Sequence, residues 1–208
     1  MADEVLLALL RAGRFDEWGA WWRAHPDQRP DLRGADLRGY DFVGRFLGPV
    51  DLSDAILTQA DLTQTSLANA ILARADLRGA RLQQANLHGV NLRNAVLARA
   101  DLNRATLSEA NLTEAVGDEA QLWGADLSEA VAVAAQLTSA NLSNAYLLEA
   151  NFAQANLTSA DLRGADLQGA TFAGALVREA HLFRSDLTSE LAAAHGYQDL
   201  RLHPFWEY

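Results

Sequence analysis

Carboxylates and histidines are the side chains of this sequence that could carry chemistry. The 208 residues include 27 Asp or Glu and five His but no Cys, which excludes disulfides, thiolate catalysis and thiolate metal sites. Histidines clustered with carboxylates bind metals or transfer protons. The histidines here are His25, His88, His181, His195 and His203, and they form no cluster with the spacing of metal ligands. We expect no metal site and no cofactor.

The carboxylates follow a short repeat and not an active-site pattern. In Ala75-Asp76-Leu77-Arg78-Gly79 the acid stands between an alanine and a leucine, and this arrangement recurs along the chain. We expect exposed carboxylates at repeat positions to have no partner placed to shift their pKa values. The glycines recur singly, without the Gly-Lys-Ser/Thr sequence of a phosphate-binding loop. The sequence therefore predicts no catalytic residues and a protein that is not an enzyme.

The repeat has a period of five residues. From Leu32 to Leu187, the 32 positions spaced five apart hold 26 leucines, three phenylalanines, one valine, one glycine and one alanine. Two residues before them, 25 of the 32 positions are alanine. The exceptions at the leucine position are Phe42, Gly117, Ala132, Phe152, Phe172 and Val177. A repeat of this regularity must be interpreted before secondary structure is assigned.

A period of five fits neither one helix nor one strand. Leucines five apart would point to all sides of an α-helix, which has about 3.6 residues per turn. In extended chain, the alanine and the leucine two residues later share a face, but the next alanine would lie on the opposite face. The chain must therefore turn a corner in each repeat, at the two residues after the leucine. Glycine and asparagine, which favour turns, are frequent at these positions.

Similarity at a spacing of 20 residues predicts four corners per coil. Leu-Ser-Glu-Ala occurs at 107–110 and again at 127–130, and other short segments repeat at the same distance. The repeats then form about eight coils of a solenoid, roughly 38 Å long at the ~4.8 Å spacing of neighbouring strands. Leucines would fill its core, so no pocket for a small molecule is expected.

Tandem Ala-(Asp/Asn)-Leu-X-X motifs resemble the pentapeptide repeat family. The resemblance covers residues 30–189 and implies an all-β solenoid, a right-handed quadrilateral β-helix. We therefore expect three parts. Residues 1–29 form an N-terminal helical cap, residues 30–189 form the β-helix, and residues 190–208 form a C-terminal cap or dimerisation tail.

The N-terminal part is expected to cover the first coil, because unpaired strand edges recruit other chains. Asp3–Ala12 and Asp16–Ala24 have the composition and end signals of helices. Aromatic residues occur at helical spacing in and directly before the second of them, at Phe15, Trp18, Trp21 and Trp22. We expect these rings to pack on the first coil; a ligand-binding aromatic box is the alternative.

At the C-terminus a short helix is expected over 189–195, followed by aromatic residues that leave the repeat. These are Tyr197, Phe205, Trp206 and Tyr208. They either cap the last coil of the same chain or pack against a second copy. The resemblance favours self-association as a homodimer, since several members of the family dimerise through C-terminal elements.

One side of the solenoid is predicted to be acidic. Residues 63–104 contain six Arg and two acids, whereas residues 105–162 contain eight acids and no Arg. With four sides per coil, residues 20 apart share a side, and no arginine follows Arg45 on the side centred on Leu107 and Leu127. That side carries Glu109, Asp126, Glu129, Glu149, Asp166 and Asp186, with the outward apolar residues Tyr146 and Leu148. Apolar anchors within a charged field are typical of interaction sites. The side is either a solvated surface or a binding site for a basic protein partner.

Other outward apolar residues are less informative. Trp123 is a further candidate contact, because large exposed aromatic residues are uncommon on surfaces without a function. Val131 and Val133 flank Ala132 on another side and are expected to be ordinary surface residues. The small Ala132 is expected to compensate for Phe152 on the neighbouring coil. The sequence gives no reason for Gly117.

Composition limits the partners and the location. The net charge is −10, and no basic stripe runs through the repeats, so direct nucleic-acid binding is disfavoured. No segment is long enough to span a membrane, and the first ten residues are too acidic for a signal peptide. We expect a cytoplasmic protein.

Two functions remain open. The first is a non-enzymatic interaction module or scaffold that presents flat solenoid faces to a protein partner. The second, implied by the resemblance, is a DNA-mimicking protein that binds the DNA-binding enzyme gyrase and protects it against gyrase poisons. The positive segment at 63–104, the short column and an unbroken register without an inserted loop all disfavour the second.

Overall fold

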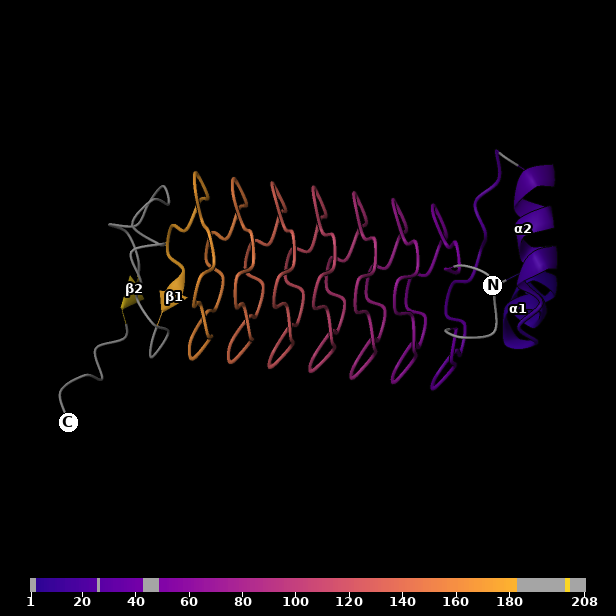
Figure 1. Ribbon diagram of the computed structural model, residues 1–208, viewed down its shortest axis with the longest axis horizontal. Coiled ribbons are helices and arrows are strands. Elements are labelled where there is room, and N and C mark those ends of the chain that lie inside the picture. The colour runs from indigo at the N-terminus through magenta and orange to yellow at the C-terminus, as the bar shows by residue number, and fades with distance from the viewer. Residues whose placement is uncertain (1–2, 26, 43–48, 183–200, 203–208) are drawn as a thin grey trace.

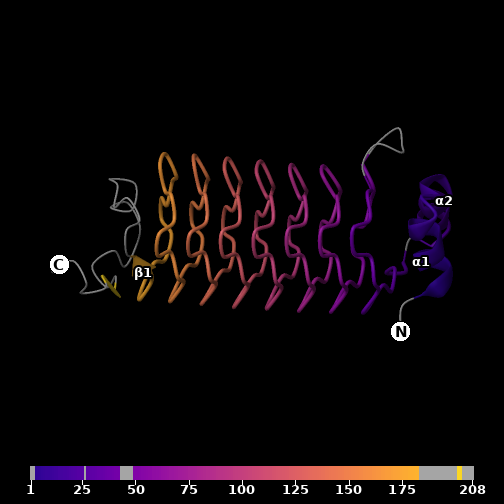
Figure 2. The same ribbon diagram turned by 90° about the horizontal axis from the view of Figure 1, so that it is seen from below.

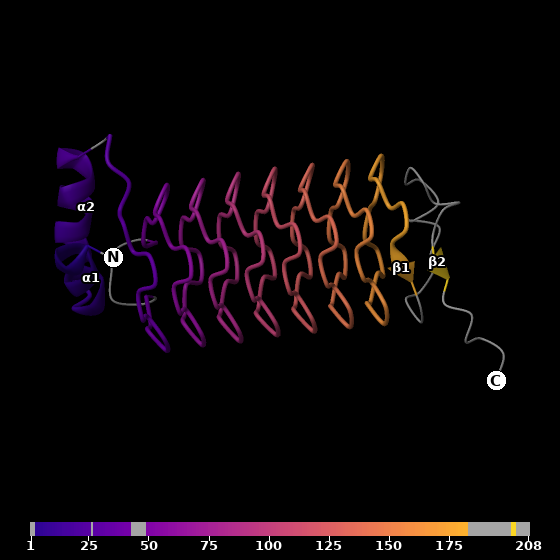
Figure 3. The same ribbon diagram turned by 180° about the vertical axis from the view of Figure 1, so that it is seen from behind.

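The computed structural model describes residues 3–25, 27–42, 49–182 and 201–202 as a column of stacked coils with two helices at one end (Figure 1). Helix α1 spans Glu4–Arg11 and helix α2 spans Phe15–Ala24. At the opposite end lie the two-residue strands β1, His181–Leu182, and β2, Arg201–Leu202. The coils follow one another along a single axis in the views from below and from behind (Figures 2 and 3).

Each side of a coil is one five-residue repeat, and equivalent sides of successive coils pair in parallel. Isolated bridges join residues 20 apart, from Asp51 with Ile71 to Asp161 with His181. In a typical pair, the backbone N–H of Leu107 donates to the carbonyl of Asp126 at 2.6 Å. Only one residue per side forms a bridge, so the column contains little continuous strand. The predicted four-sided solenoid is present; its right-handed sense stays a prediction.

The alanine and leucine positions form the core, as the repeat predicted. Every leucine position of the described coils is buried, and every alanine position except Tyr40 is buried too. Phe152 and Phe172 stack one coil apart, with ring centroids 5.4 Å apart and ring planes 7° from parallel. Ala132 precedes them on the same side of the column and is fully buried. The apolar residues therefore fill the interior from coil to coil.

The corners explain why Asp or Asn so often precedes the leucine. The second corner residue has a positive φ, 59° at Glu109 and 60° at Glu129, for example. Non-glycine residues disfavour this conformation by about 1–2 kcal/mol. The side chain of Asp126 stabilises its corner, because its Oδ1 accepts the N–H of Ser128 at 3.0 Å. Asn111 accepts the N–H of Thr113 at 3.0 Å in the same way.

Gly117 leaves space that a neighbouring side chain occupies. A Cβ atom added at this glycine would lie 3.0 Å from Cδ2 of Leu137, which is on the same side one coil later. Leu137 is 5% exposed, so it is itself part of the core. The position that the sequence left unexplained is therefore filled from the next coil.

Restoring the leucine of the repeat at Gly117 should destabilise the protein. We expect Gly117→Leu to lower the free energy of unfolding by about 1–3 kcal/mol, because overpacking displaces Leu137. Urea denaturation measures the change. The additional substitution Leu137→Ala should recover part of the loss by making room. A more stable Gly117→Leu variant would mean that the space at this position is empty.

The first coil contains five more residues than the others. Asp31, Asp36 and Asp41 bridge to residues 25 positions later, namely Ile56, Asp61 and Ser66, whereas all later bridges join residues 20 apart. From Asp41 to Asp51 the chain therefore uses ten residues for one side of the coil. The next coil uses five residues for the same side, from Ser66 to Ile71. The expectation of an unbroken coil register without an insertion was wrong. An insertion of five residues leaves a five-residue pattern intact, so the sequence did not reveal it. Arg45, expected on the acidic side, lies outside the described residues.

The N-terminal helices begin and end within one residue of their predicted bounds and pack on the first coil. In later coils, the carbonyl of each bridging residue accepts an N–H from the preceding coil. The first coil has no preceding coil, and donors from the N-terminal segment take its place. Asp3 N–H donates to Asp31 O at 2.6 Å, Arg11 Nη2 to Asp36 O at 2.9 Å, and Trp18 Nε1 to Asp51 O at 2.6 Å. Trp18 is 2% exposed, so its ring is part of the core and not of a ligand-binding box.

The C-terminal end keeps the same spacing in its last described residues. β2 pairs with β1 in parallel, with Arg201 opposite His181 and Leu202 opposite Leu182, again 20 residues apart. This contact lies within one chain, as a cap would require. The helix expected over 189–195 and the aromatic residues proposed for self-association lie outside the described residues, so that proposal stays a prediction. These aromatic residues are Tyr197, Phe205, Trp206 and Tyr208.

Candidate functional site

The predicted acidic side forms one surface of the column. Parallel bridges join Thr106 to Asp126, Asp126 to Tyr146 and Tyr146 to Asp166, so these four residues lie one above another. Tyr146 is 57% exposed, and the two aspartates are half-buried. Asp186, expected on the same side, lies outside the described residues. We call residues 106–109, 126–129, 146–149 and 166–169 the acidic side.

Three glutamates form a ladder along one edge of the acidic side. The N–H of Glu109 donates to Ser128 O at 2.9 Å, and the N–H of Glu129 donates to Leu148 O at 2.7 Å, which stacks their corners in successive coils. Glu149 occupies the equivalent corner one coil further on. All three are exposed, and within the described residues none is in an ion pair. Their negative charge is therefore uncompensated.

Arginines elsewhere on the column are paired with acids, several of them across coils. Arg74 contacts Asp54 at 2.5 Å, and Arg81 contacts Asp61 at 3.3 Å. Other pairs are Arg78 with Asp76 at 2.6 Å, Arg99 with Glu119 at 2.9 Å and Arg93 with Glu114 at 4.0 Å. The positive charge counted over residues 63–104 is thus largely neutralised by local partners. These pairs also involve Glu114 and Glu119, whereas the acids of the acidic side have no arginine partner among the described residues.

Four large apolar side chains are exposed on and beside the acidic side. Tyr146 is 57% exposed, Leu148 and Val131 38% each, and Trp123 36%. Trp123 lies at the corner that precedes Asp126, and Val131 lies on the next side, two residues after the corner at Glu129. All four belong to two successive coils. We call them, with Glu109, Asp126, Glu129 and Glu149, the acidic–apolar patch.

Val131 was not predicted to belong to this group. The sequence placed it on a neighbouring side and treated it as an ordinary surface residue. The structure keeps it on that side, two residues after Glu129, with its side chain 38% exposed. In the described coils, Leu176 is the one large exposed apolar residue outside the patch, at 41% exposure. The exposed apolar residues occur on all four sides, but four of the five lie on two successive coils, at or beside the acidic side.

Trp123 is held in place by neighbouring residues of the previous coil. The guanidinium carbon of Arg104 lies 4.6 Å from the centroid of the Trp123 ring, a cation–π contact. The backbone N–H of Trp123 donates to Oδ1 of Asn103 at 2.9 Å. The ring is therefore oriented at the border of the acidic side before any partner arrives.

Tyr146 occupies a position where an aspartate would stabilise the column better. Directly before and after it, Asp126 and Asp166 accept the N–H groups of Ser128 and Gln168 at 3.0 and 3.1 Å. Tyrosine has no side-chain acceptor for the equivalent N–H of Leu148. This corner therefore lacks a hydrogen bond that would contribute about 0.5–1.5 kcal/mol to the free energy of unfolding. Residues that reduce local stability and expose apolar surface are typical of functional sites.

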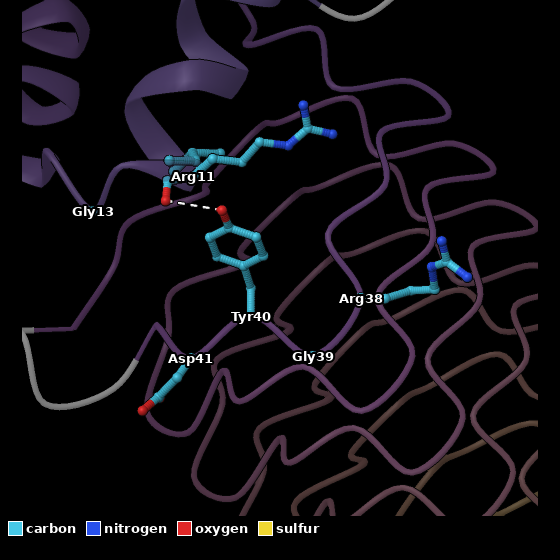
Figure 4. A pocket seen from close by; sticks show the side chains of 7 residues that line it. Arg11, Gly13, Arg38, Gly39, Tyr40 and Asp41 are labelled. Atoms are coloured by element: carbon cyan, nitrogen blue, oxygen red, sulfur yellow. Dashed lines mark hydrogen bonds between the residues drawn. The ribbon is translucent and has the colours of Figure 1, made fainter.

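A shallow cavity of about 350 Å³ lies between α1 and the first coil, lined by Arg11, Arg38 and Tyr40 among others (Figure 4). Its polar groups already have partners. Tyr40 donates to the carbonyl of Arg11 at 2.9 Å, and Arg38 donates to both carboxylate oxygens of Asp36 at 2.9 and 2.7 Å. Hydrogen bonds from Arg38 lower the pKa of Asp36 to about 2, which keeps this pair ionised. The cavity is therefore a gap in the packing between α1 and the first coil, and we do not assign a ligand to it.

Over the part of the chain that the structure describes, His, Asp and Glu form no group of three or more that could hold a metal ion. No helix among the described residues is long and apolar enough to cross a membrane.

A model of a known protein family matches the repeats. A model of the family described as pentapeptide repeats matches residues 50–84, 95–131, 135–174 and 160–189, in eight copies. Among solved structures, the chain is similar to HetL, a pentapeptide repeat protein involved in heterocyst differentiation regulation from the cyanobacterium Nostoc sp. strain PCC 7120. The two are 29% identical over 88% of this chain and 94% of that chain, with a TM-score of 0.34.

Two further solved structures are similar to this chain. One is QnrB1, a plasmid-mediated fluoroquinolone resistance protein, with 17% identity over 83% of this chain and 92% of that chain and a TM-score of 0.39. The other is the pentapeptide repeat protein Rfr23 from the cyanobacterium Cyanothece 51142. Its identity is 24% over 72% of this chain and 88% of that chain, with a TM-score of 0.30. No curated protein matches the chain.

Proposed function

The chain belongs to the pentapeptide repeat family, and from this premise we propose that it is a non-enzymatic interaction module that binds a basic protein partner through its acidic–apolar patch. One observation carries the proposal. Four of the five large apolar side chains exposed on the described coils lie on two successive coils, on or beside the side that carries glutamates without ion-pair partners. The rest of the column serves as a rigid support, filled with leucine and alanine.

The physical chemistry of the patch suits binding more than catalysis. Burial of Tyr146, Leu148 and Trp123 by a partner removes apolar surface from water, at about 25 cal/mol per Å² before the costs of association. The glutamate ladder favours basic partners and speeds their approach, while repelling acidic ones. Stacked coils fix the positions of all these groups in advance, which lowers the entropy lost on binding.

We expect the variant Tyr146→Asn, Leu148→Ser to lose binding without losing stability. Asparagine at 146 can cap its corner as Asp126 does, and serine at 148 matches Ser108 and Ser128 in the neighbouring coils. Affinity for the partner should fall at least about tenfold, roughly 1.4 kcal/mol. Crosslinking and affinity capture from the native lysate identify the partner, titration calorimetry measures its affinity, and thermal unfolding measures stability.

Leu176→Asn is the matched control for Tyr146→Asn. It makes a comparable change at an equivalent bridging position, 41% exposed, on another side of the column. Binding should be unchanged in this variant. Equal affinity of the parent and the Tyr146→Asn, Leu148→Ser variant would show that the patch is only a solvated surface.

A second candidate function is a DNA mimic that binds gyrase and blunts gyrase poisons. The ladder of Glu109, Glu129 and Glu149, on a side without arginine among the described residues, favours it, as does the pairing of the arginines at 63–104. Supercoiling and quinolone-poisoning assays with purified gyrase test it. Protection that the triple glutamate-to-glutamine variant loses would support the mimic, and no effect of the parent protein at micromolar concentration would eliminate it.

A further inference from the structure

We infer that the acidic–apolar patch accepts a basic amphipathic α-helix that lies along the axis of the column. This inference rests on the proposed function and specifies the partner of the same surface. It follows from two features of the patch, namely the state of its backbone hydrogen bonds and the spacing of its carboxylates.

The patch offers no free backbone edge to a partner strand. The N–H of Tyr146 donates to Ala125 O at 2.9 Å and its carbonyl accepts the N–H of Leu127 at 2.7 Å. The N–H of Leu147 donates to the carbonyl of Asp166, one coil on, at 2.8 Å. These groups are bonded along the column, so a peptide cannot add as a further strand. A partner must therefore bind through side chains alone.

The spacing of the glutamate ladder matches the turns of a helix. Coils stacked at the ~4.8 Å spacing of strands place Glu109 and Glu149 about 10 Å apart along the axis, with Glu129 midway. Basic residues at positions i, i+4 and i+7 of an α-helix extend over about 10.5 Å at ~1.5 Å per residue. One basic side chain can therefore face each glutamate.

An extended segment laid in the same direction fits less well. Its side chains on one face recur every ~6.7 Å, so three of them span about 13 Å, and the outer two miss their glutamates. The helix also suits the apolar part of the patch, because Leu148 directly precedes Glu149 and Tyr146 lies on the same acidic side, three residues before this glutamate. An amphipathic helix places an apolar stripe beside its basic stripe in the same manner.

Two synthetic peptides of identical composition test the inference. Both contain 18 residues of Lys, Leu and Ala, about five helical turns at 3.6 residues per turn. The first places Lys and Leu in adjacent helical stripes, and the second alternates them with a period of two; circular dichroism verifies their conformations. Fluorescence anisotropy measures binding to the full-length protein at low and at physiological salt.

We expect the helical peptide to bind at least about tenfold more tightly than its isomer, with affinity that falls as salt rises. Tyr146→Asn should weaken helix binding about tenfold, and so should the replacement of Glu109, Glu129 and Glu149 by Gln. Leu176→Asn should have no effect. Equal binding of the two isomers, or helix binding that the patch variants leave unchanged, would overturn the inference.

The result is separable from the test of the proposed function. Loss of the lysate partner in the Tyr146→Asn, Leu148→Ser variant, together with equal binding of the two peptides, would refute the helix and leave the interaction module. A lysate partner that binds this variant like the parent would refute the module, whatever the peptides do.

Discussion

Replacing Leu97 with alanine should lower the free energy of unfolding by about 2–5 kcal/mol. Leu97 is 2% exposed and lies in the middle of the column, so truncation leaves a cavity. The neighbouring coils cannot move inward to close it, because backbone hydrogen bonds fix them. The N–H of Leu97 donates to Val116 O at 2.6 Å, and Val96 N–H donates to Ala75 O at 2.9 Å. Urea denaturation followed by circular dichroism measures the loss.

Leu176→Ala is the control for this experiment. It removes the same atoms on the same side of the column, but from a side chain that is 41% exposed and points outward. Its effect should stay within about 0.5 kcal/mol. Similar losses in the two variants would contradict the assignment of alternate residues to core and surface.

Deleting residues 1–29 should make the protein aggregate. The deletion removes the donors that Asp3, Arg11 and Trp18 supply to the carbonyls of the first coil, and it exposes the core residues of that coil. An open edge with unpaired backbone groups and apolar surface is a template for association. Size-exclusion chromatography with light scattering should detect large species in place of the parent.

The variant Trp18→Phe separates the effect of the Trp18 hydrogen bond from the effect of its apolar packing. It keeps an aromatic ring in the buried position but removes the hydrogen bond to Asp51 O, so stability should fall by about 1–3 kcal/mol while the protein stays soluble. If the protein without residues 1–29 is soluble and monodisperse, the N-terminal helices have a purpose other than capping the first coil.

The sequence by itself determined the interior and the corners of this protein. A leucine every five residues, with alanine two residues before, admits only extended pieces joined by corners, and the structure confirms that these positions are buried. Asp or Asn before the leucine indicates where each corner is capped, as at Asp126 and Asn111. The acidic side could also be predicted, since residues 20 apart share a side, and so could the outward position of Tyr146.

Only the tertiary structure decided what happens between coils. Four features were not predicted. They are the five extra residues of the first coil, the use of the Gly117 space by Leu137, the pairing of Arg99 with Glu119 and the place of Val131 in the patch. The physical reason is the range of the interactions. Each side of the solenoid is fixed by about five neighbouring residues, and the sequence shows these directly. Contacts across coils depend on the register between segments 20 or 25 residues apart, which the backbone hydrogen bonds of the folded column set.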